Sequence, residues 1–114
     1  MTYMITSSTV VDFDPGKWEK NFNEKKYGLN CMRDILDSML FGRIFAIFSD
    51  EYEKNGEMRF SITAEYQGDV IFAACTWRDD GDTLRVISFR PASDDEEEDY
   101  YEEARAFLNP STDD

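Results

Sequence analysis

Apolar and polar positions follow a helical period in the first part of the chain and a strand period in the middle. Between residues 14 and 40, apolar side chains recur every three to four positions, which is typical of helices. Asp14-Pro15-Gly16 predicts one helix start, because Asp caps well and Pro is tolerated in the first turn, and Gly28 predicts its end. A second helix is predicted over residues 30–40, with apolar positions at Met32, Ile35, Met39 and Leu40.

From residue 43 the period changes to two, and short polar segments separate the apolar stretches. Strands are predicted at residues 43–48, 59–66, 70–77 and 83–90. Residues 51–56 are charged and predict a turn, while residues 67–69 and 79–82 predict the tight turns of two hairpins. Because the connections are short, consecutive strands favour an antiparallel meander of about four strands.

The acidic segment after the last strand predicts a third helix, from Ser93 to about residue 108. Ser93 and Glu96 have the spacing of a capping box, which marks a helix start. The apolar face of this helix is predicted at Tyr100, Tyr101, Ala104, Phe107 and Leu108.

Together these elements predict a single α+β domain over residues 13–108. It would contain two N-terminal helices, a roughly four-stranded antiparallel sheet and a C-terminal helix. Residues 1–12 predict an N-terminal arm or an edge strand, and residues 109–114 predict a flexible tail.

Charge is distributed unevenly along the chain. The net charge of the 114 residues is −13, and residues 93–114 hold ten acidic residues and one basic residue. Binding to nucleic acid normally needs a basic surface, so the chain as a whole would repel it. The acidic balance fits a basic protein partner, or solubility alone. With no apolar stretch of the roughly 20 residues that a membrane span needs, and two cysteines expected as buried free thiols, a cytoplasmic location is predicted.

Several classes of chemistry have no residues to support them. The chain has no histidine, which removes the commonest general acid–base and the commonest zinc ligand. It has no CxxC pair, Walker loop, nucleophile elbow or GxGxxG segment, so no cofactor is expected. Asp79, Asp80 and Asp82 have the chemistry to bind a hard cation, but their spacing is not that of a calcium loop, and a plain hairpin turn is favoured.

Four arginines lie on or beside the predicted strands, at Arg59, Arg78, Arg85 and Arg90. Two or three of them beside one sheet could clamp a phosphate. Arg85 and Arg90 would point to opposite faces of a regular strand, unless a bulge near Pro91 intervenes. The alternative is that each arginine pairs with one of the 25 acidic residues, and the number of acids favours this alternative.

The acidic segment has two interpretations as well. Carboxylates in a first helical turn are stabilised by the helix dipole, which accounts for about three of them. Further carboxylates repel one another at i,i+4 spacing, so they form either a solvated face or a face retained for binding. The predicted partner-binding residues are Asp94, Asp95, Glu97, Glu98, Asp99, Glu102 and Glu103.

Three segments carry patterns that occur together in one protein family. The first has an aromatic-Asp-x-x-Lys start and an Asn-x-x-Lys-x-Gly end, here at Phe13, Asp14, Lys17, Asn23, Lys26 and Gly28. Arg59 then opens a strand. The closing pattern is Arg-x-Ile-Ser-x-Arg-x-Ala followed by Glu and Tyr, here at Arg85, Ile87, Ser88, Arg90, Ala92, Glu96 and Tyr100. Over about residues 13–103 the chain therefore resembles the BrnT toxins, small RelE-like ribonucleases that pair with a BrnA antitoxin.

This resemblance implies the α+β layout given above and a ribonuclease site that works without metal through Arg59, Arg85 and Arg90. The chain departs from the family in three ways. Tyr27 replaces the family histidine, the first helix needs about two extra residues to align, and the start of the last helix is acidic where the family is rich in arginine and lysine. RNA contacts cannot persist at a helix start of that charge.

Two functions follow as the main expectations, and an acidic antitoxin-like or structural partner without an inhibitory role is a third. The first is an acidic, non-catalytic binding protein on a BrnT-like scaffold, which blocks a basic nucleic-acid-binding protein or complex by mimicking nucleic acid. A phage inhibitor of a host defence complex, such as an anti-CRISPR protein, would fit. The alternative is an active BrnT-like ribonuclease toxin of a type II toxin–antitoxin system, with an antitoxin as its partner.

Overall fold

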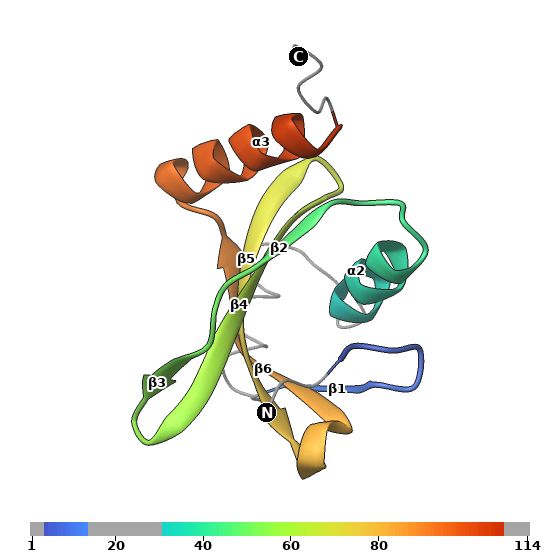
Figure 1. Cartoon of the computed structure of the whole chain (residues 1–114), viewed down its shortest axis with the longest axis vertical. Helices are drawn as coiled ribbons and strands as arrows, with labels where there is room; N and C mark the ends of the chain where they lie inside the picture. Colours follow the sequence, from blue (N-terminus) through green and yellow to red (C-terminus); the bar gives the residue numbers. More distant parts are fainter. Residues whose placement is uncertain (1–3, 14–30, 109–114) are drawn as a thin grey trace, which may run out of the picture.

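The computed structural model describes residues 4–13 and 31–108. Within these ranges a sheet occupies the centre of the molecule, α2 lies beside it, and α3 lies across one end of it (Figure 1). The strands are β1 (Val10–Phe13), β2 (Ala46–Phe48), β3 (Tyr52–Lys54), β4 (Glu57–Tyr66), β5 (Asp69–Arg78) and β6 (Thr83–Pro91). The helices are α2 (Cys31–Leu40), α3 (Asp94–Leu108) and a short 3₁₀ turn, η1 (Asp79–Gly81).

The sheet is built around the antiparallel meander of β4, β5 and β6, as the alternating pattern predicts. Its full order is β1-β6-β5-β4-β2. At one edge β2 pairs antiparallel with β4, and at the other β1 pairs parallel with β6. β3 pairs with the end of β4 that β2 leaves open. Every described strand therefore finds a partner along the three long strands of the meander.

The main core lies between α2 and one face of the sheet. Met32, Ile35 and Leu36 of α2 are fully buried there. The alternate residues of the long strands form the other side of this core: Phe60, Ile62, Ala64, Ile71, Ala73, Cys75, Leu84, Val86 and Phe89. Arg33 of α2 donates one hydrogen bond to the carbonyl of Thr9, the residue before β1, and another to the Asp37 carboxylate of its own helix. An amphipathic helix on a half-apolar sheet buries the apolar stripe of both elements.

A second, smaller cluster joins α3 to the opposite face of the sheet. Tyr100 and Ala104 are buried against Val70, and Phe45 and Ile47 pack at the margin of this cluster. This cluster contains far fewer apolar groups than the main core. α3 is therefore a helix whose inner side is anchored by a few residues and whose outer side faces solvent.

The predicted layout, two N-terminal helices before a roughly four-stranded antiparallel sheet, is wrong. In the described residues the sheet has six strands and is mixed, since β1 pairs parallel with β6 and precedes α2 in the chain. The first predicted helix, from Asp14 to Gly28, lies outside the described residues, so one helix, α2, stands before the meander in the part that is described. Parallel pairing of β1 depends on contacts with a strand some seventy residues away, which no local pattern reveals.

Two predictions within the meander also need correction. Residues 51–56, predicted as a turn, contain β3 and the tight turn that joins it to β4. At this turn Asn55 and Gly56 both have positive φ, as a two-residue hairpin of this kind requires, and Asn-Gly is a strong hairpin pattern. The strand predicted over residues 43–48 is shorter and begins at Ala46. Gly42 and the turn that closes α2 occupy the preceding residues.

Candidate partner-binding surface

α3 begins with the capping box that the sequence predicts. The backbone N–H of Ser93 donates to the Glu96 carboxylate at 2.8 Å, and the N–H of Glu96 donates to the Ser93 hydroxyl at 3.2 Å. Two of the N–H groups that a helix start leaves unpaired are satisfied in this way. The start of the acidic helix is thus fixed by local hydrogen bonds at the end of β6.

Two tyrosines fix the rotation of α3 on the sheet. The Tyr100 hydroxyl donates to the Phe45 carbonyl at 2.7 Å and accepts the N–H of Glu65 at 3.3 Å. The Tyr101 hydroxyl donates to the Glu65 carboxylate at 3.1 Å. The Phe107 ring lies 4.9 Å from the Phe45 ring, which adds a contact near the helix end. Because Tyr100 and Tyr101 point toward the sheet, most of the carboxylates of α3 lie on the other sides of the helix.

Most of the acidic residues of α3 form one exposed surface, which we call the outer acidic face. Its members are exposed, and their carboxylates make no hydrogen bond or ion pair with any described residue; they are Asp94, Asp95, Glu98, Asp99, Glu102 and Glu103. Six of the seven predicted partner-binding residues therefore lie together. The seventh, Glu97, is half-buried and acts on Tyr101, where burial, Glu65 and then Glu97 all raise the pKa of the phenol.

Glu96 differs from its acidic neighbours because it has a partner inside the protein. Both of its carboxylate oxygens accept hydrogen bonds from Arg90, at 2.8 and 2.9 Å. The Arg90 guanidinium lowers the pKa of Glu96 to about 2. Arg90 itself lies over the Phe72 ring, 4.2 Å from its centre. Glu96 thus belongs to the attachment of α3, whereas the outer acidic face has no compensating arginine in the part of the chain that the structure describes.

The charge density of α3 is comparable with that of nucleic acid. Eight of the first ten residues of the helix are acidic, and ten residues extend about 15 Å at the helical rise. The helix thus has one carboxylate per roughly 2 Å of axis, against about 1.7 Å per charge in duplex DNA. Six of these eight carboxylates belong to the outer acidic face, so a basic surface would meet one charge per roughly 2.5 Å there.

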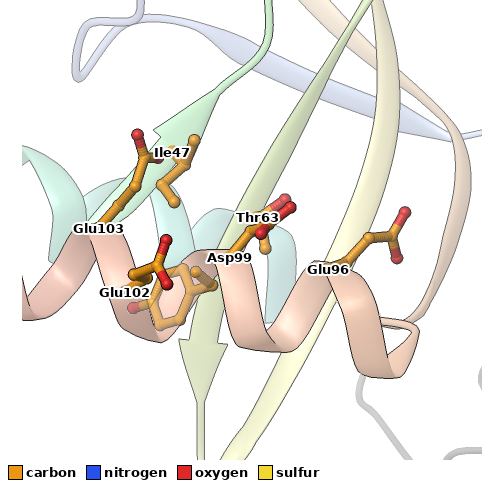
Figure 2. Close-up of a pocket in the computed structure, with 7 residues that line it drawn as sticks. Ile47, Thr63, Glu96, Asp99, Glu102 and Glu103 are labelled. Carbon is orange, nitrogen blue, oxygen red and sulfur yellow. The ribbon is translucent and has the colours of Figure 1, made fainter.

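A groove of about 400 Å³ lies between the outer acidic face and the sheet. Figure 2 shows Asp99, Glu102 and Glu103 on the helical side, with Ile47 and Thr63 on the strands beside them. Glu96 lines the same groove near the start of the helix. Sequence reasoning missed the contribution of Ile47 and Thr63, because β2 and β4 reach α3 only through the tertiary fold.

The three arginines of the alternative ribonuclease site lie on one face of the sheet. β6 contains a β-bulge with one extra residue at Ile87, because Ala74 of β5 pairs with Ser88 and the next residue, Cys75, pairs with Val86. As a result Arg85 is opposite Thr76 and Arg90 is opposite Phe72. Phe72 and Thr76 are four residues apart on β5 and face the same side, so Arg85 and Arg90 do too. Arg85 and Arg90 therefore share a face, but through a bulge at Ile87 and not through the predicted one near Pro91.

These arginines do not form one cluster. From the strand geometry, Arg85 and Arg90 are about 13 Å apart along β6, and Arg59 lies about 10 Å from Arg85 across two strand spacings. Arg59 faces the same side, since it precedes Phe60, whose side chain belongs to the main core on the opposite face. These are backbone separations, and each guanidinium is directed by the carboxylate to which it donates.

Each of these arginines also has its own carboxylate. Glu57 accepts hydrogen bonds from Arg59 at 3.2 Å and from Arg78 at 2.6 Å. Asp12 of β1 accepts one from Arg85 at 2.8 Å. The pKa of Glu57 is lowered by these two arginines, against the opposing effect of burial. The arginines of the sheet therefore pair with acidic residues, which is the alternative that the composition favours.

The remaining candidate groups show no site within the described ranges. The Asp79 carboxylate accepts a hydrogen bond from the Thr83 hydroxyl at 3.0 Å, a contact across the turn between β5 and β6. No group of three histidine, cysteine or acidic side chains that could hold a metal ion is found among the described residues. Cys31 and Cys75 are free and buried, and burial raises the pKa of both thiols, that of Cys31 to about 12. Neither thiol is ionised at neutral pH, so neither is suited to act as a nucleophile.

No protein-family model matches this chain, and no curated protein matches it either. The resemblance to the BrnT toxins therefore stays a prediction from motifs. In the residues that the structure describes, no helix is long and apolar enough to cross a membrane.

Proposed function

We propose that this protein binds a basic, nucleic-acid-binding protein through the outer acidic face of α3 and blocks it by occupying the place of nucleic acid. A phage inhibitor of a host defence complex, such as an anti-CRISPR protein, is the setting in which such a protein would act. The observation that carries the proposal is that the six carboxylates of this face are exposed and have no partner among the described residues.

The energetics of α3 support a role for this face beyond folding. Asp94 and Asp95 lie in the first turn, where the helix dipole stabilises them. Glu98, Asp99 and Glu102 lie beyond it, and like charges at i,i+4 spacing cost a few tenths of a kcal/mol per pair. A mixed face would give a more stable helix. Retention of the charge is explained if a partner supplies the opposite charges.

The ribonuclease alternative has less support. Arg59, Arg85 and Arg90 share a face of the sheet, but each is hydrogen bonded to a carboxylate of its own. An RNA phosphate would have to displace those carboxylates one by one and would approach a molecule of net charge −13. The role of these arginines in the proposed function is therefore to hold the fold together by pairing with carboxylates.

The test is capture of partners from bacteria that express the tagged protein, together with a growth curve. We expect normal growth and capture of a nucleic-acid-binding protein or complex. The variant Asp95→Lys, Glu98→Lys, Asp99→Lys and Glu102→Lys is expected to capture none of it, because each substitution replaces attraction by repulsion.

A matched control carries the same change in net charge at exposed positions outside α3: Asp50→Lys, Glu51→Lys, Glu53→Lys and Asp82→Lys. It is expected to retain the partner. Equal capture by both variants and the wild type would show that the outer acidic face is not the binding surface. Growth arrest with degraded messenger RNA, abolished by Arg85→Ala or Arg90→Ala, would instead support the ribonuclease.

A further inference from the structure

We propose that the groove beside the outer acidic face receives one arginine side chain of the protein partner. This inference rests on the proposed function and names the chemistry that the same surface recognises. The groove has a volume of about 400 Å³, which lies within the range usual for pockets that hold small ligands. It would give the acidic surface a defined anchor point in addition to its long-range charge.

The two walls of the groove differ in character. Asp99, Glu102 and Glu103 line the helical wall, and none of the three has a hydrogen-bonding partner among the described residues. Ile47 and Thr63 line the other wall, where they are paired residues of β2 and β4 (Figure 2). A ligand in this groove would meet carboxylates on one side and a largely apolar strand surface on the other.

The buried hydroxyl of Thr63 is a second observation, independent of the carboxylates, that indicates a ligand in the groove. Thr63 is only 9% exposed, it lines the groove, and its hydroxyl makes no hydrogen bond to any described residue. A buried hydroxyl normally has a partner, because burial without one costs free energy. An N–H donor in the groove would supply the missing partner and would be held by the carboxylates at the same time.

The chemistry of both walls fits a guanidinium group best. A guanidinium presents five N–H donors in a fixed plane and is more weakly hydrated than an ammonium, so it tolerates an apolar wall such as Ile47. A hard metal ion would need several carboxylates converging on one point, and no such group is found among the described residues. A lysine ammonium would gain the charge but not the planar contact.

One carboxylate of the groove, Glu96, already binds a guanidinium from within the chain. Arg90 donates two parallel hydrogen bonds to Glu96, at 2.8 and 2.9 Å, at the end of the groove near the helix start. This fork geometry is the usual one for arginine and a carboxylate. Asp99 and Glu103 follow at the next helical positions of the same wall, so a partner's arginine would continue a pattern that Arg90 begins.

The test compares two peptides as probes, nine-residue polyarginine and nine-residue polylysine, by titration against the full chain. We expect polyarginine to bind about tenfold more tightly than polylysine at equal salt, because only arginine makes the planar, bidentate contact. Asp99→Asn and Thr63→Val should each remove most of that preference. Asp95→Asn neutralises an exposed carboxylate outside the groove and should lower both affinities by about twofold without changing the preference.

The outcomes separate this inference from the proposed function. The arginine site would be overturned if both peptides bound with equal affinity and if Asp95→Asn and Asp99→Asn lowered that affinity equally. The outer acidic face would then be a general electrostatic surface. No binding of either peptide would overturn both. Agmatine, a free guanidinium compound, should bind at least about a hundredfold more weakly than the peptide, since it gains only one contact, and equal affinity would overturn assignment to a protein side chain. Unchanged thermal unfolding of Thr63→Val confirms that a lost preference reflects the groove.

Discussion

The arginines of the sheet and the outer acidic face of α3 are both charged, but in the described residues only the arginines have ion-pair partners inside the protein. Arg59, Arg78, Arg85 and Arg90 each donate to an acidic side chain. The six carboxylates of the outer acidic face have no such partner among the described residues. Charge on the sheet therefore serves to connect strands and helix, whereas charge on α3 is available to another molecule.

Arg90 is where the two regions meet, and its removal is expected to have the largest effect on stability. Arg90→Ala would lose two hydrogen bonds to Glu96 and the contact with Phe72, and would leave a half-buried carboxylate without its partner. We expect the free energy of unfolding to fall by about 2 kcal/mol, measured by urea denaturation.

Arg85→Ala is the matched control for this variant. It removes one hydrogen bond to the exposed Asp12 of the edge strand β1, and should cost about 0.5 kcal/mol. Equal losses for the two variants would mean that Arg90 does not hold α3 to the sheet. The contrast between the paired arginines of the sheet and the carboxylates of α3 that are unpaired in the described residues would then be much weaker.

The pair of Arg90 and Glu96 should also be visible in the pH dependence of stability. Hydrogen bonding to Arg90 lowers the pKa of Glu96 from its ordinary value to about 2 in the folded protein. A lowered folded pKa stabilises the fold above the unfolded pKa of about 4.3, and this contribution is lost as the pH falls toward 2.

Glu96→Gln isolates this contribution, because glutamine does not titrate. The difference in unfolding free energy between wild type and Glu96→Gln is expected to be about 1 kcal/mol at pH 6 and to shrink toward zero near pH 2. A difference that stays constant over this range would show that Glu96 does not act through its charge.

The smallest expected effect has the opposite sign. Glu98 lies at i,i+4 spacing from both Asp94 and Glu102, so Glu98→Gln removes two repulsive pairs. We expect a gain of about 0.5 kcal/mol in unfolding free energy. Glu51→Gln, an exposed position outside α3, controls for the general benefit of lowering a net charge of −13. Equal gains from both variants would indicate that the outer acidic face carries no local repulsion.

The sequence predicts those features that depend on neighbouring residues. The capping box of Ser93 and Glu96, the hairpins of the meander and the grouping of carboxylates on α3 all follow from spacing over a few positions. Of the acidic residues, Glu96 could have been set apart in advance, since it is the capping-box residue and Arg90 lies just before the helix.

Features that depend on distant contacts could not be predicted in this way. The parallel pairing of β1 with β6 joins residues that are far apart in the chain, and β1 is only four residues long. The bulge at Ile87 reverses the side to which Arg90 points, and one extra residue in a strand has no distinct sequence pattern. The groove depends on Thr63 and Ile47, which meet α3 only after the sheet has formed.

Displacement of nucleic acid from the captured partner is the most direct test of the account. A labelled oligonucleotide bound to the purified partner would be titrated with wild type, with the fourfold lysine variant of α3 and with the matched lysine variant outside α3. The account predicts that wild type and the matched variant displace the oligonucleotide, while the α3 variant is weaker by about a hundredfold or more. Displacement by the α3 variant at the wild-type concentration would contradict it.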